Sequence, residues 1–172
     1  MSRRRYSVNT SSEMTTYTIT YTSNPPQLQF YRKIIKVTDV SGTRKAKNFT
    51  VSLCLNNCKK TINNATSNAD KDTSILWTLV YLPEHFDLNN FSFGNDTAGA
   101  SILEPNQHVI MSGIISAQDG VKRYTSSLSR NLNSGDTIVL YWRIYTPAPS
   151  TYPGITSTEL ELASQITCAI SY

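Results

Sequence analysis

The chain has 172 residues and a mass of 19.2 kDa, which is the size of one domain with a single core. Ser, Thr and Asn account for 56 of these residues and only 16% are charged, so the composition favours strands and turns and excludes a helical bundle. The net charge of +4 is unevenly spread: residues 1–60 hold eleven Lys or Arg against two acidic residues, whereas residues 61–172 hold five against ten.

In chain order, the first half of the sequence predicts four strands. Apolar residues that alternate with threonines indicate the first strand, from Thr15 onward, and the third strand would place Lys47 and Phe49 on the same face. The fourth is apolar on both faces, so we expect it at the centre of a sheet. The polar segment 57–73 predicts a short helix or a loop. These strands are expected over residues 15–22, 28–37, 47–55 and 75–82, with turns at 24–26 and 41–42.

The second half begins with a long polar segment, residues 84–106, which we expect to be exposed and to cross between two sheets. Four more strands follow, over residues 109–117, 122–128, 138–144 and 160–170, with turns at Asp119-Gly120 and Asn133 to Asp136 and a loop at 147–154. Eight antiparallel strands with turn signals between them predict an all-β fold, an eight-stranded antiparallel jelly-roll sandwich or a related Greek-key sandwich.

Side chains that carry chemistry are scarce. Cys54 and Cys58 have a spacing that suits a metal, but no second cysteine pair exists and His85 and His108 are isolated in sequence. We therefore expect no metal site, and we expect Cys54 and Cys168 to be small buried apolar groups. No nucleophile motif or phosphate-binding glycine loop is present, so the sequence predicts neither an enzyme nor a cofactor.

The sequence also argues against a membrane protein. The longest apolar stretch, residues 75–82, is eight residues long, whereas a bilayer-spanning helix needs about 20. The first residues, MSRRRYSVNTSSE, are basic but lack the apolar core of a secretory signal. We expect synthesis in the cytosol and no membrane insertion.

Four segments resemble the capsid proteins of circular, Rep-encoding single-stranded DNA (CRESS-DNA) viruses, and cyclovirus and circovirus-like capsids most of all. Residues 75–84, ILWTLVYLPE, look like the W-A-L-V-Y-V-P-E strand of these proteins. Residues 103–110, LEPNQHVI, resemble their L-Y-E-P-N-Q-x-V-I segment, and residues 127–136, SLSRNLNSGD, their L-x-R-N-L-N-S-G-D turn. Residues 47–51, KNFTV, are similar to a K-N-F-T-hydrophobic strand.

This resemblance implies a jelly roll of the viral coat type, of which sixty copies self-assemble into a T=1 icosahedral shell around circular single-stranded DNA. It implies a protein of the virion, present in the host cytoplasm and nucleus during assembly, with an unidentified cell-surface receptor or glycan as a further partner. The chain would then consist of a short basic and polar N-terminal arm, residues 1–14, and a jelly-roll capsid domain, residues 15–172. The family's long Arg-rich arm is reduced here to Arg3, Arg4 and Arg5.

The excess of positive charge in residues 1–60 predicts a polyanionic partner, nucleic acid first. The alternative is that these side chains keep a β protein soluble and protect strand edges. Tyr6, Tyr31 and Tyr124 lie beside basic residues, where they would stack on bases or pack in the core or an interface. The expected nucleic-acid-binding residues are Arg3, Arg4, Arg5, Arg32, Lys33, Lys36, Arg44, Lys45 and Lys47.

Two further expectations are open to test. The main alternative function is a jelly-roll carbohydrate-binding, lectin-like module, because Tyr- and Asn-rich loops suit sugars. For a coat protein, deletion of residues 2–12 should leave empty shells able to form, since the three arm arginines carry too little charge to neutralise a genome.

Overall fold

The structure is a computed structural model that describes residues 5–20, 29–35, 42–62, 65–67, 71–85, 108–145 and 155–171. The expected turn at 24–26 and the expected loop at 147–154 lie outside the described residues, as does nearly all of the polar segment 84–106. The described residues form strands and turns without a helix, so the prediction of an all-β, antiparallel fold is confirmed. They accordingly contain no helix long and apolar enough to cross a membrane.

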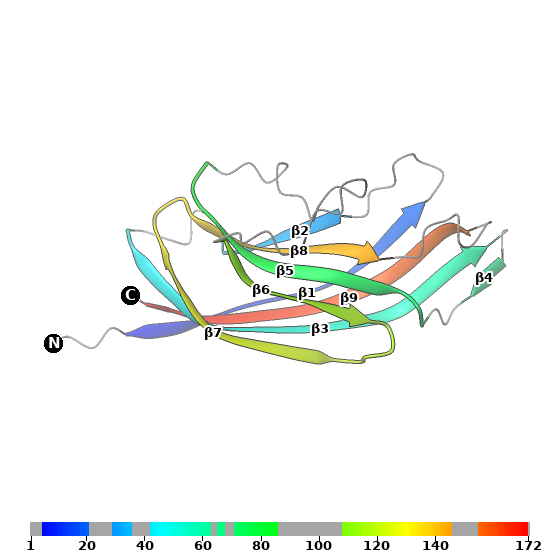
Figure 1. Cartoon of the computed structure of the whole chain (residues 1–172), viewed down its shortest axis with the longest axis horizontal. Helices are drawn as coiled ribbons and strands as arrows, with labels where there is room; N and C mark the ends of the chain where they lie inside the picture. Colours follow the sequence, from blue (N-terminus) through cyan, green and yellow to red (C-terminus); the bar gives the residue numbers. More distant parts are fainter. Residues whose placement is uncertain are drawn as a thin grey trace.

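Within the described ranges, nine strands form two sheets that face each other as a sandwich (Figure 1). One more strand is present among the described residues than the eight expected, because three residues of the polar segment 57–73 pair with the end of β3 as a short strand. The strands are β1 (Tyr6–Thr20), β2 (Gln29–Ile35), β3 (Arg44–Ile62), β4 (Ala65–Ser67), β5 (Ser74–Leu82), β6 (Val109–Ser116), β7 (Lys122–Leu132), β8 (Thr137–Tyr145) and β9 (Ile155–Ser171).

Sheet A has the order β1-β9-β3, with β7 and β4 both pairing with β3, and sheet B has the order β2-β8-β5-β6. If the short β4 is set aside, the pairing is nested. β1 pairs with β9, β2 with β8, β3 with β7, and β5 with β6, all antiparallel. The chain therefore folds as one long antiparallel hairpin that is wrapped over on itself, which brings β9 beside β3 and β8 beside β5.

Strand β1 begins at Tyr6 rather than at Thr15, so residues 6–14, which we had expected to be an arm, belong to sheet A. They pair with β9 without interruption, from Tyr6 opposite Ser171 to Thr20 opposite Ser157. Residues 6–14 show no apolar alternation, because Ser7, Asn9 and Ser11 occupy the inward positions. The strand forms because β9 offers an unpaired edge to its backbone groups.

The core lies between the sheets and is filled by the inward side chains of both. Trp77, Leu79 and Leu140 of sheet B and Phe49 and Leu53 of sheet A are among its fully buried members. On the opposite face of sheet B a second buried cluster contains Val80, Leu82, Val139 and Tyr141. Strand β5 is thus buried on both faces between β8 and β6, as its sequence predicted.

Candidate nucleic-acid interface

Two of the expected cations, Lys45 and Lys47, lie at one end of sheet A on the face that points away from sheet B, called here the outer face. Lys47 lies in register with Ala169 of β9, which in turn lies opposite Val8 of β1. The side chain of Val8 is 75% exposed, so this row faces solvent. Lys45 is two residues before Lys47 on the same strand, and Arg5 is exposed just before β1.

A β-bulge puts Lys47 on this face. The sequence predicted that Lys47 and Phe49 would share a face, but the register of β3 shifts between them, and Asn48 adopts a left-handed backbone conformation with φ of 55°. The extra residue turns Phe49 into the core and leaves Lys47 on the opposite side. There the ammonium nitrogen of Lys47 lies 3.9 Å from the centre of the Tyr6 ring, a cation–π contact.

Arg32 is engaged in a structural ion pair. Its Nη1 donates to the Glu13 carboxylate at 2.9 Å, and its Nη2 donates to the backbone oxygen of Ser11 at 3.5 Å. Because Arg32 belongs to β2 and Glu13 to β1, the pair ties the edges of the two sheets together. Partial burial alone would raise the pKa of Glu13, but the hydrogen bonds from Arg32 and Thr15 and the charge of Arg32 outweigh burial and lower that pKa.

The remaining expected cations lie elsewhere. Lys33 is exposed and in register with Val139, so it sits on the outer face of sheet B, on the far side of the sandwich. Arg44 is in register with the buried Leu132 and therefore takes the inward face at the end of sheet A. Arg3, Arg4 and Lys36 lie outside the described residues. The structure thus brings Lys45 and Lys47 together, with Arg5 just before β1 at the same end of sheet A, and separates the other described members of the set.

The set expected from the sequence lacks Arg123, a cation on the outer face of sheet A that no described carboxylate pairs with. Arg123 of β7 is exposed and lies directly opposite Ser52 of β3. The alternation of inward and outward residues along β7 could have identified Arg123 as an outward residue. Its neighbour Tyr124 turns inward, where its ring lies 4.8 Å from Trp77 and its hydroxyl donates to the oxygen of Ile114. Tyr124 is therefore a packing residue, and Arg123 must face out.

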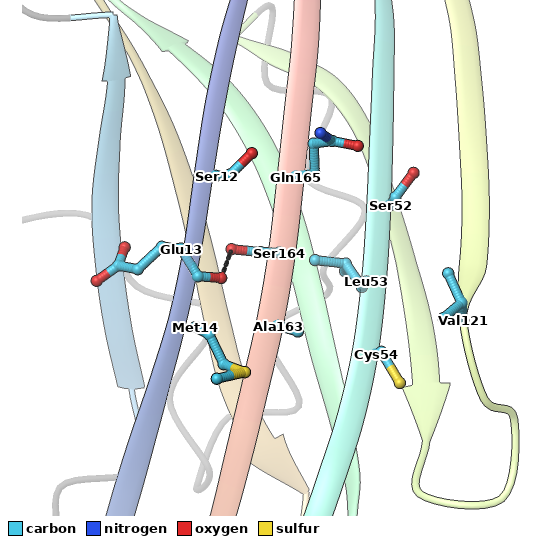
Figure 2. A pocket seen from close by; sticks show the side chains of 10 residues that line it. All are labelled: Ser12, Glu13, Met14, Ser52, Leu53, Cys54, Val121, Ala163, Ser164 and Gln165. Atoms are coloured by element: carbon cyan, nitrogen blue, oxygen red, sulfur yellow. Dashed lines mark hydrogen bonds between the residues drawn. The ribbon is translucent and has the colours of Figure 1, made fainter.

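A shallow pocket of about 520 Å³ lies on the same face, next to Arg123 (Figure 2). β1, β9 and β3 each contribute side chains to it, and Val121 closes the end beside β7. One side of the pocket is polar and the other is apolar. Its lining residues are Ser12, Glu13, Met14, Ser52, Leu53, Cys54, Val121, Ala163, Ser164 and Gln165.

Of the three cysteines, only Cys54 is accessible, and it lines that pocket. All three cysteines are free, and Cys58 and Cys168 are buried. Burial raises the pKa of the Cys168 thiol to about 11. Cys54, which we expected to be buried as well, is half-buried and lines the pocket, because it points away from the core-facing Leu53 and Leu55. Among the described residues, no three His, Cys, Asp or Glu side chains are grouped so as to hold a metal ion.

Three of the four segments that resemble capsid proteins are joined around one buried carboxyl group, that of Asp136. The Tyr81 hydroxyl donates to it at 2.8 Å, and the backbone N–H groups of Glu84 and Asn133 donate at 3.1 and 2.7 Å. The backbone N–H of Tyr81 also donates to the oxygen of His108. Three segments far apart in sequence are therefore joined by hydrogen bonds. This cluster fixes where β5 ends relative to the β7–β8 turn and is structural in character.

Tyr81 makes the cluster sensitive to alkaline pH. Its burial, followed by the hydrogen bond and charge of Asp136, raises the pKa of Tyr81 to about 12 from an ordinary value of 10.0. The folded state therefore holds this proton more tightly than the unfolded state. The resulting stability is complete below pH 10 and is lost as the pH rises from 10 to 12.

We expect Tyr81→Phe to lose less stability than the parent protein between pH 9 and pH 12 in urea unfolding. The comparison cancels the titration of other groups, because both proteins share them. Equal losses in the two proteins would show that Tyr81 does not titrate as its surroundings indicate.

No protein-family model and no curated protein sequence matches the chain. Among solved structures, a crystal structure of a CocE/NonD family hydrolase from Staphylococcus aureus is similar over 97% of this chain, with 10% sequence identity and a TM-score of 0.39. A second structure described as a CocE/NonD family hydrolase from the same organism is similar over 98%, with 11% identity and a TM-score of 0.37. This chain spans 37% of the length of each of those proteins.

Proposed function

We propose that this chain is a coat-type subunit: a jelly roll that self-associates into a closed T=1 shell of sixty copies around circular single-stranded DNA. The observation that carries the proposal is the strand order. Eight strands, nested from the outermost pair β1–β9 to the innermost pair β5–β6 and divided between two four-stranded layers, are what two linked Greek keys produce. On this assignment β4 is an addition to the end of β3.

Jelly rolls occur in coat proteins, lectins and cupins, so the fold alone does not specify the function. The side chains on the surface are needed to distinguish these classes. Lys45, Lys47 and Arg123 lie on one outer face, and no described carboxylate pairs with any of them. Unpaired cations on one face favour a polyanion over a neutral sugar. This supports nucleic acid as the partner and disfavours the lectin alternative.

Assembly is tested by sedimentation velocity and negative-stain electron microscopy of the purified protein, with and without circular single-stranded DNA. We expect uniform shells of about 1.2 MDa of protein, the mass of sixty chains of 19.2 kDa. Monomers alone across all salt, pH and DNA conditions would contradict the coat-protein proposal. Binding to a glycan array by such monomers would favour the lectin-like module instead.

A further inference from the structure

The outer face of sheet A is an ordered grid, because residues in register on neighbouring antiparallel strands point to the same side of a sheet. Four successive rows run across β1, β9, β3 and β7 from the end that carries Lys47. The rows consist of Tyr6, Lys45 and Asn131; then Val8, Ala169, Lys47 and Ser129; then Thr10, Thr167, Thr50 and Thr125; then Ser12, Gln165, Ser52 and Arg123.

We propose that these four rows bind the sugar–phosphate backbone of single-stranded nucleic acid, with Lys45, Lys47 and Arg123 at phosphates and bases resting in the adjoining pocket. This inference deepens the proposed function, because it gives the DNA of the shell a site on the protein. The proposed site does not include Arg32 and Lys33, which the sequence grouped with Lys45 and Lys47 as nucleic-acid-binding residues.

The charge of the rows is the first support. They hold three cations and no carboxylate, and Arg5 adds a fourth cation just before Tyr6. The acidic residues of this face lie at the other end of the strands. There Glu159 pairs with Lys59 at 2.9 Å, and Glu161 accepts from the Asn57 amide at 3.4 Å. A polyanion is therefore attracted to the half of this face that carries Lys45, Lys47 and Arg123.

The small polar side chains are the second support. The cations are surrounded by hydroxyl and amide side chains, and such groups commonly donate hydrogen bonds to phosphate and sugar oxygens. Lys45 and Lys47 are about 6.8 Å apart along β3, since residues two apart on an antiparallel strand are separated by two rises of about 3.4 Å. The ring of Tyr6 lies against the Lys47 ammonium group, and the next row consists of four threonines, over which a strand of nucleic acid can lie close to the sheet.

The pocket is the third support. It adjoins the row of Arg123, with Ser12, Ser52 and Gln165 on its polar side. On its other side Met14, Ala163 and Cys54 lie in register with one another, and Val121 extends that apolar row (Figure 2). A nucleobase has apolar faces and polar edges, and this lining offers both. Contact of bases with apolar surface does not depend on their sequence, so the binding is expected to be non-specific.

The first test compares two variants that each remove two positive charges. Lys47→Gln with Arg123→Gln changes the proposed site, and Lys33→Gln with Arg143→Gln changes the outer face of sheet B, where Arg143 lies opposite Leu76. The probe is a fluorescent 20-nucleotide oligo-dT, titrated from 50 to 300 mM NaCl. A phosphate contact contributes about −0.7 to the slope of log affinity against log salt.

We expect the site variant to flatten that slope by about 1.4 and to weaken binding about 25-fold at 0.1 M salt, which is what the loss of two contacts predicts. The sheet B variant should keep the parent slope. Lys47→Arg with Arg123→Lys, which preserves both charges, should restore it. A parent slope in the site variant, or flattening only in the sheet B variant, would overturn the proposal.

The second test uses Cys54 as a reporter of the pocket, because it is the described cysteine that is not buried. Oligo-dT at ten times its dissociation constant should slow modification of Cys54 by a thiol reagent about tenfold. Cys54→Ser supplies the background rate. Unchanged modification at saturating oligo-dT would remove the pocket from the binding site.

The two proposals fail in different ways. Shells with normal sedimentation but with DNA binding unaffected by the site variant would overturn this inference alone. Salt-sensitive binding through Lys47 and Arg123 by a protein that never assembles would overturn the coat function alone. Loss of self-association in the site variant, with oligo-dT binding unchanged, would show that the face contacts a second copy of the chain and not nucleic acid.

Discussion

Replacing Asp136 with alanine is expected to lower the free energy of unfolding by about 4 kcal/mol, because it removes a buried carboxylate and leaves three partly buried donors without an acceptor. These donors are the Tyr81 hydroxyl and the backbone N–H groups of Glu84 and Asn133. For a domain of this size the melting temperature should fall by roughly 10 °C. Chemical unfolding at pH 7, followed by tryptophan fluorescence, measures the loss directly.

Asp119→Ala is the matched control for this prediction. Asp119 also accepts a backbone N–H within a turn, that of Ser116, and it pairs with Lys122 at 2.8 Å. It is exposed, however, so water replaces the contacts that are lost and the effect should be much smaller. Losses of similar size in the two variants would mean that burial does not set the importance of Asp136.

Gly135 is restrained by the same cluster. Its φ of 94° is a conformation that side chains disfavour, and a Cβ atom on it would collide with the side chain of Glu84. The contact shows how closely the end of β5 approaches the β7–β8 turn. It explains why the turn signal at residues 133–136 and the Leu82-Pro83-Glu84 segment belong to one structural unit.

Deletion of residues 2–12 is expected to destabilise the fold and prevent assembly, which reverses the expectation drawn from the sequence. The deletion removes Tyr6 to Ser12, seven of the fifteen residues of β1, together with their pairing to β9. With about 0.5–1 kcal/mol for each ladder hydrogen bond lost, the free energy of unfolding should fall by about 4 kcal/mol. Half of β9 would also become an open edge that favours aggregation.

Deletion of residues 2–5 tests the contribution of the arm arginines without changing β1. It removes three arginines but leaves β1 whole, so the melting temperature and shell formation should match those of the parent. The salt dependence of oligo-dT binding should weaken by no more than about 2.1 in slope, the contribution of three contacts. Empty shells formed by the protein that lacks residues 2–12 would show that β9 tolerates the loss of half of β1.

Much of the fold was predictable from the sequence because its signals are local. Strand β5 is apolar on both faces, and strand β8 places Trp142 and Ile144 inward, as their residue patterns indicated. The turns at Gly120 and Gly135 have the positive φ values that their Asp-Gly and Ser-Gly sequences favour. In each case the residues that specify the element are its immediate neighbours in the chain.

The residues of the interface were predictable only in part, because a charge run in sequence does not specify a face. Arg32 and Lys33 are adjacent in the chain, yet one is inward and ion-paired while the other is outward on sheet B. The bulge at Asn48 placed Lys47 on the outer face, against the simple alternation of β3. Arg123 is outside every charge cluster of residues 1–60 and joins Lys47 only through the pairing of β7 with β3.

The sequence by itself determined that the chain is all-β, where its central strand and tight turns lie, and that positive charge is concentrated in residues 1–60. These properties depend on composition, on a two-residue period and on turn residues, all of which act over a few positions. The tertiary structure decided the extent of β1, the joining of Tyr81, Glu84, Asn133 and Asp136, and the face that each cation occupies. These depend on register between strands more than 40 residues apart, and a shift of one residue in register sends every side chain of a strand to the opposite face.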